Sequence, residues 1–187
     1  MRRLQGQFLV LLVGLLLAGP LMSADKTRIH IQDMDINLVD ELYQIQGKIE
    51  IDLEDPLLSA LNSGVALEFV INYEIVRSRG WWFDKQIAEV SQRYQISYHA
   101  LSRQYLLTNL NTRTVDTFYS LARLEEVLGQ VSDFPLLDAS LLRPKKVYRI
   151  RMRAYFNYDE LPIPLRMRAY SSSAWRPDSG WLVWPLR

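Results

Sequence analysis

The chain has 187 residues, of which 49% are hydrophobic and 23% charged, and this composition fits one ordinary globular domain rather than a disordered chain. Its 22 basic and 21 acidic side chains nearly balance, so bulk attraction to nucleic acid is not indicated. The absence of cysteine excludes a disulfide framework, a thiolate metal site, a cysteine nucleophile and a lipid-attachment cysteine.

The first 24 residues have the three zones of a secretory signal: a basic start, an apolar run over residues 8–18, and small residues before Ala24. The apolar run is shorter than the roughly 20 residues that a membrane-spanning helix needs. We therefore expect an N-terminal signal helix over residues 1–24, cleavage near Ala24 and a periplasmic location. The alternative is an uncleaved signal that anchors the chain in the inner membrane, because Met22 is a poor residue three places before the cut. Membrane contact is expected only through this segment, if it is uncleaved.

The chain after the signal begins with strand patterns. Residues 43–54 alternate apolar and polar side chains with a period of two, which predicts a long half-buried strand. Residues 27–36 carry a weaker form of the same pattern, so the two segments predict a hairpin. Residues 55–64 predict a two-turn helix, because an aspartate and a proline stand at its start and a glycine at its end.

A meander of strands is predicted next, from the alternation over residues 66–76, 88–98, 103–110 and 113–119. Residues 99–102 form a plausible four-residue connection within it.

The last third of the chain is more mixed. Residues 120–129 predict a second short helix, with a capping serine, an apolar stripe and a final glycine. Residues 131–142 are apolar and irregular, with prolines nearby. Residues 147–158 predict a strand, and residues 159–164 a turn that returns the chain along a strand at 165–169. A loop and one more short strand close the sequence.

These elements predict an all-β fold of about eight mainly antiparallel strands, arranged as a β-sandwich or open barrel, with two short helices. No repeat or linker divides residues 25–187, which we expect to form a single domain.

Catalytic patterns are weak. The two histidines, His30 and His99, lie on different predicted strands without metal-ligand spacing, and zinc needs three or four convergent ligands. No glycine loop of the phosphate-binding kind is present. His99 lies near two serines but has no glycine-framed serine elbow, so a hydrolase built around His99 is a third-ranked alternative. We expect no enzymatic activity, no catalytic residue, no metal and no cofactor.

Arginines alternate along the strand predicted at 147–158, and Arg166 and Arg168 would face them across the predicted hairpin. Such a basic stripe can contact anionic lipid, a glycan or an acidic partner. The interpretation that we favour is cross-strand pairing with a row of acidic residues of matching length and period, Glu50, Asp52 and Glu54.

The tryptophan pair Trp81 and Trp82 is the least ordinary feature. Neighbouring residues on a strand point to opposite faces, so the two rings cannot both enter one core unless the chain bulges or turns. Either the C-terminal tryptophans cover the outer ring, or it belongs to a partner-binding hot spot. Our leading hypothesis is a non-enzymatic protein-interaction module whose surface contains Trp81, Trp82 and Arg103.

The alternative is a periplasmic module that binds lipid or glycan. A cavity of a few hundred cubic ångström between the sheets, lined by Tyr94, Tyr98 and Tyr105, would favour this function. A filled interior would count against it, because the same tyrosine row is most simply part of the core.

Several strings of the sequence resemble one known family. They are LNSGV at 61–65, WWFD at 81–84, YQISYHALSRQY at 94–105, LTNLN at 107–111, PLLD at 135–138, LPIPL at 161–165 and, near the end, Trp175 and SGW at 179–181. The family is a bacterial envelope family called domain of unknown function 4390, and the resemblance spans essentially the whole mature chain. SYHALSR at 97–103 is its most specific part.

The resemblance implies a signal-bearing protein of Gram-negative-type bacteria, encoded near a membrane sensor kinase of the nitrogen-regulation type. An envelope membrane protein, or the ectodomain of such a kinase, is therefore the partner that the resemblance implies. It implies no known activity or cofactor, so no site residue can be transferred from it.

Overall fold

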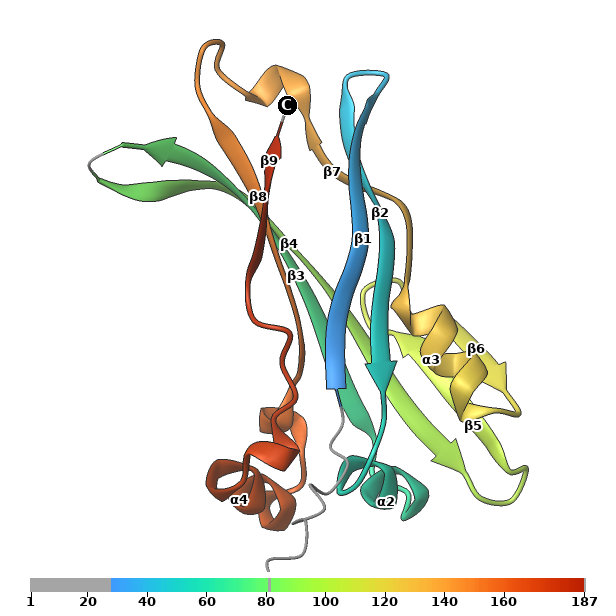
Figure 1. Cartoon of the computed structure of the whole chain (residues 1–187). Helices are drawn as coiled ribbons and strands as arrows, with labels where there is room; N and C mark the ends of the chain where they lie inside the picture. The colour runs from blue at the N-terminus through green and yellow to red at the C-terminus, as the bar shows by residue number, and fades with distance from the viewer. Residues whose placement is uncertain (1–27, 81, 187) are drawn as a thin grey trace, which may run out of the picture.

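The computed structural model describes residues 28–80 and 82–186, which form two antiparallel sheets and three short α-helices (Figure 1). The predicted all-β class with sandwich-like antiparallel sheets is confirmed, and no closed barrel forms among the described residues. The predicted signal helix over residues 1–24 and Trp81 lie outside the described residues.

The smaller sheet has the order β1-β2-β7, with β1 at Arg28–Val39, β2 at Leu42–Asp52 and β7 at Gln130–Asp138. The predicted hairpin of β1 and β2 is confirmed, and pairs such as Ile31 with Ile49 place isoleucines on the inner face. The prediction that residues 131–142 are irregular was wrong over β7. This strand escaped detection because it contains Pro135, which an edge strand tolerates.

The larger sheet has the order β6-β5-β4-β3-β8-β9 and is antiparallel throughout. The predicted meander is confirmed, although β4 starts at residue 82 rather than 88. The strands are β3 (Leu67–Arg79), β4 (Trp82–His99), β5 (Gln104–Asn109), β6 (Val115–Phe118), β8 (Tyr148–Phe156) and β9 (Leu182–Leu186).

The helices are α2 (Leu57–Asn62), α3 (Leu121–Gly129) and α4 (Ile163–Ser171), with short 3-10 turns η2 (Ala139–Leu141), η3 (Tyr158–Glu160) and η4 (Ser173–Trp175). The first two helices were predicted. The return strand predicted at 165–169 was wrong, because this segment is α4. Its prolines, Pro162 and Pro164, stand at the helix start, where a missing N–H costs nothing.

The core lies between the two sheets. Tyr73 of β3 stacks on Phe134 of β7 with ring centroids 5.0 Å apart, and Phe69 meets Phe156 at 5.5 Å. Burial raises the pKa of the Tyr73 hydroxyl, so this ring stays neutral at any physiological pH. α3 closes one side of the core with Leu124 and Leu128.

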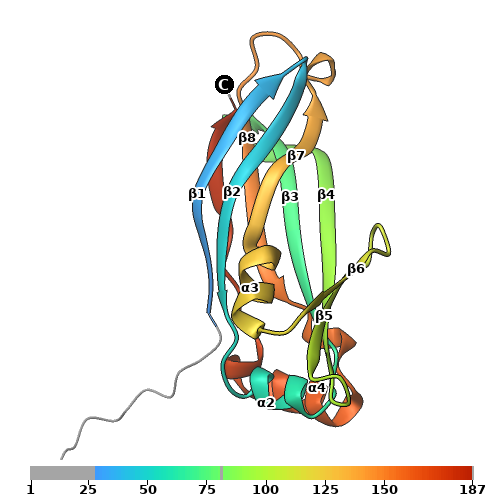
Figure 2. The same cartoon turned by 90° about the vertical axis from the view of Figure 1, so that its right-hand side faces the viewer.

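The strands run between two ends of the molecule, which differ in character (Figures 1 and 2). The helical end carries α2, α4, the start of β1 and the β4–β5 turn. The loop end carries the β1–β2 turn, the β3–β4 hairpin, the β7–β8 connection and the end of β9. Residues at one end are therefore separated from residues at the other by the length of the strands.

Candidate partner-binding surface

The residues predicted for one partner-binding surface lie at opposite ends of β4. Trp82 begins this strand at the loop end, whereas Arg103 lies in the turn that follows the strand at the helical end (Figure 1). With 18 residues, β4 spans about 55 Å, at about 3.3 Å per residue. The structure therefore does not bring Arg103 near Trp82. The side chain of Trp82, like the whole of Trp81, lies outside the description.

The loop end instead gathers positive charge from two segments that are distant in sequence. We call residues 77–86 of the β3–β4 hairpin and residues 139–149 of the β7–β8 connection the basic platform. Together they contain seven basic residues and one acidic residue, Asp84. The basic residues are Arg77, Arg79, Lys85, Arg143, Lys145, Lys146 and Arg149.

Backbone pairing holds the two segments of the basic platform against each other. Arg77 is the register partner of Tyr148 on β8, and the Ser78 N–H donates to the Val147 carbonyl at 3.0 Å. The Arg143 N–H donates to the hydroxyl of the buried Tyr148 at 2.9 Å. The positive charges are thus carried on backbone fixed by β3 and β8.

A hollow of about 280 Å³ lies where the segments meet, and its lining includes Arg77, Lys85, Arg143 and Tyr148. Within the basic platform, Arg149 forms an ion pair with Asp84 at 3.9 Å. In the described part of the chain, the cations that line the hollow, Arg77, Lys85 and Arg143, form no ion pair. Among the described residues, these three cations therefore have no carboxylate within ion-pair distance.

Apolar side chains stand exposed beside these cations. Phe83 is 96% exposed at the hairpin tip, and Leu141 and Val147 project from the β7–β8 connection. Large exposed apolar side chains that are flanked by charge are typical of interaction sites. The basic platform therefore combines charge with exposed apolar surface.

The arginines of β8 are neutralised, in contrast to the basic platform's hollow. Arg151 pairs with Glu74 at 3.3 Å and lies 4.7 Å from the centre of the Trp181 ring, and Arg153 pairs with Asp178. The prediction that these arginines pair with acidic side chains of the same chain is confirmed, but the predicted partners were wrong. Glu50, Asp52 and Glu54 belong to the other sheet or follow it. Arg166 and Arg168 lie on α4, away from this row.

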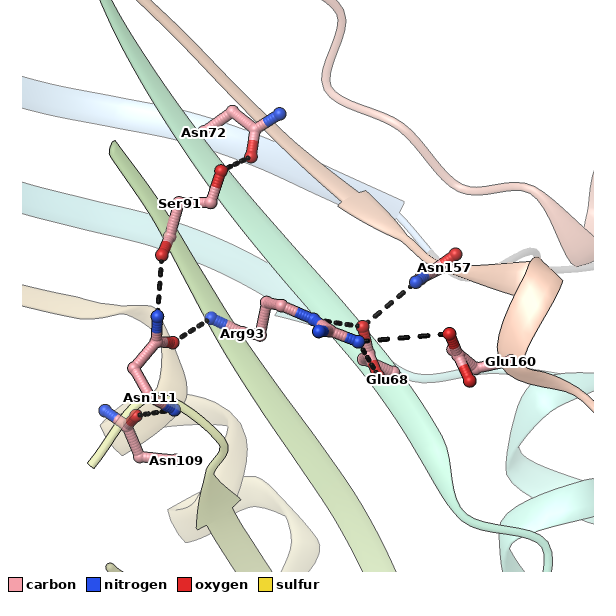
Figure 3. A network of polar contacts seen from close by, with 8 residues as sticks. All are labelled: Glu68, Asn72, Ser91, Arg93, Asn109, Asn111, Asn157 and Glu160. Carbon is pink, nitrogen blue, oxygen red and sulfur yellow. Dashed lines mark hydrogen bonds and ion pairs between the residues drawn. The ribbon is translucent and has the colours of Figure 1, made fainter. Parts of the chain in front are cut away.

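A polar network also joins residues on the outer face of the larger sheet, and it was not predicted from the sequence (Figure 3). Arg93 donates two hydrogen bonds to the buried Glu68, whose Oε1 also accepts from the Asn157 side chain at 2.9 Å. Asn111 accepts from the Arg93 backbone N–H at 2.7 Å and donates to the Ser91 carbonyl at 2.9 Å. These hydrogen bonds join β3, β4, the β5–β6 turn and the end of β8.

Tyr94, Tyr98 and Tyr105, the residues predicted to line a ligand cavity, lie half-buried on the inner face and pack against the core. The Tyr98 and Tyr105 rings are 4.9 Å apart, and burial raises the pKa of Tyr94. A hollow of about 650 Å³ lies elsewhere, and its lining includes Arg28, Arg176 and Asp178.

His99 and Ser102 are neighbours in the exposed β4–β5 turn. The His99 Nδ1 lies 3.0 Å from the Ser102 hydroxyl and also accepts from the Ser102 backbone N–H at 3.3 Å. Both contacts are local bonds of the turn, and among the described residues no carboxylate is bonded to this histidine. The arrangement therefore has the form of a turn-stabilising contact.

A family model described as Domain of unknown function (DUF4390) matches residues 26–185, which is most of the chain and contains both segments of the basic platform. The chain belongs to the DUF4390 family. Searches of curated proteins and of solved structures found no match. The family assignment confirms the resemblance found in the sequence, and it adds no activity to this DUF4390 chain.

Over residues 28–80 and 82–186, no helix is long and apolar enough to cross a membrane. Within the same ranges, no group of three or more histidine, aspartate or glutamate side chains is placed to hold a metal ion.

Arg143, Lys145 and Lys146 were missed by sequence reasoning. Their signal is a basic run without acidic neighbours between two apolar stretches. Its significance depends on the hairpin cations, which lie some 60 positions earlier in the sequence. Only the pairing of β3 with β8 brings the two groups together.

Proposed function

We propose that this chain is a non-enzymatic, exported module that binds an acidic surface of another envelope protein through the basic platform. The observation that carries the proposal is the charge of the basic platform, seven basic residues against one acidic, in a chain whose total charge nearly balances. Unpaired like charges repel one another, so such a cluster weakens the fold unless an external group neutralises it. An acidic partner would supply that neutralisation.

Exposed apolar side chains support a protein partner. Phe83, Leu141 and Val147 give the basic platform apolar surface to bury, and arginine and aromatic residues are enriched where binding energy concentrates in interfaces. The basic residues would steer encounter with the partner, and the apolar residues would slow its dissociation.

The sequence supports an envelope location for this binding. The signal-like residues 1–24 support export to the periplasm, with cleavage or retention as an anchor both compatible with the proposal. The ectodomain of a membrane sensor kinase is the partner class that the family resemblance suggests.

A charge-neutralising variant tests the proposal. The triple substitution Arg143→Ala, Lys145→Ala and Lys146→Ala removes three exposed cations of the basic platform and keeps the backbone bond from residue 143 to Tyr148. We expect it to reduce the yield of partner crosslinked to the full-length chain in cells at least tenfold. The yield for the wild-type chain in cell-free membranes should fall as salt is raised.

The matched control removes the same amount of charge elsewhere, by Arg28→Ala, Lys48→Ala and Arg176→Ala, which are also exposed. This control should retain the partner. Equal loss or equal retention in the two triple variants would refute the assignment of the surface. If the platform variant kept its protein adducts but lost binding to anionic vesicles, the lipid-binding alternative would replace this proposal.

A further inference from the structure

The helix α4 turns an apolar stripe away from the protein. Ile163, Met167 and Tyr170 follow one another at helical spacing on one side of the helix, and all three are exposed. The opposite side of α4 faces the core through the buried Ala169 and the half-buried Leu165. On a surface helix of a monomeric domain, the side that faces solvent normally carries polar side chains.

Specific contacts fix α4 in this orientation. The Arg166 guanidinium donates to the Leu161 carbonyl from Nε at 3.2 Å and from Nη2 at 2.9 Å. The Tyr170 hydroxyl donates to Asp159 at 3.3 Å, and its ring meets that of Tyr158 edge-on at 5.7 Å. Contacts of Arg166 and of Tyr170, a member of the stripe, therefore fix the orientation in which α4 presents Ile163 and Met167.

β1 starts at the same end of the molecule as α4. β1 begins at Arg28 beside α2 and α4, and the β4–β5 turn with its 94%-exposed Leu101 lies at this end too (Figures 1 and 2). Nine residues separate the apolar run that ends at Ala18 from Arg28. Fully extended, this length of chain reaches about 35 Å at most, which limits the distance between Arg28 and an attached residue 18.

We propose that α4 lies on the surface of an anionic phospholipid bilayer, with the stripe of Ile163, Met167 and Tyr170 among the lipid headgroups. Helices that lie at such interfaces combine exposed apolar and aromatic side chains with basic residues, and α4 carries two arginines and no acidic residue. A bilayer that contains residues 8–18 would lie at this end, within reach of the stripe.

This placement sets the orientation of the molecule relative to the membrane. β3 has 13 residues and spans about 40 Å, so the basic platform stands on the order of 40 Å from a bilayer that contacts α4. The platform then faces away from the membrane, toward the space that a partner's ectodomain occupies. The lipid contact goes beyond the proposed protein-binding function and uses a different surface.

Fluorescence quenching in vesicles tests the lipid contact. The chain has no native cysteine, so Met167→Cys accepts a single nitrobenzoxadiazole probe in the full-length protein. After reconstitution into vesicles of phosphatidylethanolamine and phosphatidylglycerol, brominated lipid should quench this probe several-fold more than a probe at Val147→Cys. The control is matched, because Val147 and Met167 are 64% and 63% exposed and lie at opposite ends.

A second variant separates lipid contact from a folding effect. Ile163→Asp places a charge in the exposed stripe and should lower the quenching at position 167 several-fold while the circular dichroism spectrum stays unchanged. No preferential quenching at position 167, or stronger quenching at position 147, would overturn the proposal. The assay contains no protein partner, so its failure is distinguishable from failure of the proposed protein binding.

Discussion

Arg93 and Glu68 form a two-point ion pair across the β3–β4 ladder, with Nε to Oε1 at 2.9 Å and Nη2 to Oε2 at 3.0 Å (Figure 3). The two residues are diagonal neighbours, because Glu68 is the register partner of Gln95 and Arg93 that of Val70. Hydrogen bonding to Glu68 raises the pKa of the Arg93 guanidinium, so this guanidinium stays charged. A buried carboxylate on the outer sheet face is thereby compensated.

Removal of the Arg93 side chain should destabilise the fold strongly. Arg93→Ala leaves Glu68 buried with Asn157 as its remaining side-chain donor, and an uncompensated buried charge costs about 3 kcal/mol or more. Because Arg93 itself is half-exposed, we expect about 2 kcal/mol in urea unfolding. Arg168→Ala, which removes an exposed arginine, should change stability by less than about 0.5 kcal/mol. Equal effects of the two variants would show that the pair does not stabilise the sheet.

Glu125 of α3 should make stability depend on pH in the acid range. Burial, together with the charges of Asp52 and Glu54, raises the pKa of its carboxyl group, although the Leu53 N–H donates to it at 2.8 Å. The folded state therefore binds a proton more readily than the unfolded state, so this contribution is fully present below the usual pKa and is lost as pH rises through the folded pKa. Charged Glu125 thus opposes folding at neutral pH.

Glu125→Gln keeps an oxygen that accepts from Leu53 and removes the charge. We expect the variant to be more stable than the wild type at neutral pH, with the difference shrinking as pH falls toward 4, measured by thermal unfolding. A constant difference across this range would contradict the account. Glu125→Leu leaves the Leu53 N–H without its acceptor and should lose about 1 kcal/mol.

The close approach of α3 to β2 depends on Gly129. A Cβ at this position would lie 1.9 Å from the Ile49 carbonyl oxygen, which is backbone and cannot rotate away. Gly129→Ala should therefore displace the helix end and cost about 1–3 kcal/mol. Gly64→Ala meets no atom within 4 Å and measures the cost of a positive φ alone, about 1 kcal/mol. If Gly129→Ala were the milder of the two, the packing of α3 would be different.

Tyr105 should act through its ring rather than its hydroxyl. The ring contacts Tyr98, whereas the hydroxyl is 3.5 Å from the Asn62 side chain, at the limit of hydrogen bonding. Tyr105→Phe should change the unfolding free energy by less than about 0.5 kcal/mol, and Tyr105→Ala by about 2 kcal/mol. A large loss in the phenylalanine variant would assign the hydroxyl a role that the packing does not explain.

Local patterns predicted the parts of the fold in which one face is buried and the other solvated. The alternation of β1, β2 and β3 is of this kind, since their inner residues meet across the core. α4 was mistaken for a strand because five residues with alternating apolar positions fit both periods. Its helical face became visible only through the buried Ala169.

The polar network and the basic platform both depend on contacts between residues that are distant in sequence. Glu68 and Arg93 are 25 positions apart, and the two segments of the basic platform are farther apart still. Pairing of β3 with β4 and β8 creates both arrangements, and no spacing in the sequence encodes it. Arg103 shows the converse, because it is 21 positions from Trp82, fewer than separate Glu68 from Arg93, and yet lies beyond the other end of β4.

Site-specific photo-crosslinking tests the central claim most directly. Benzoylphenylalanine is placed in living cells either at Phe83, in the basic platform, or at Leu101, which is similarly exposed at the other end of β4. We predict a discrete envelope-protein adduct from position 83, mapped to an acidic segment of the partner and lost in the platform triple variant. An adduct of equal yield from position 101, or none from position 83, would contradict the claim that the basic platform binds the partner.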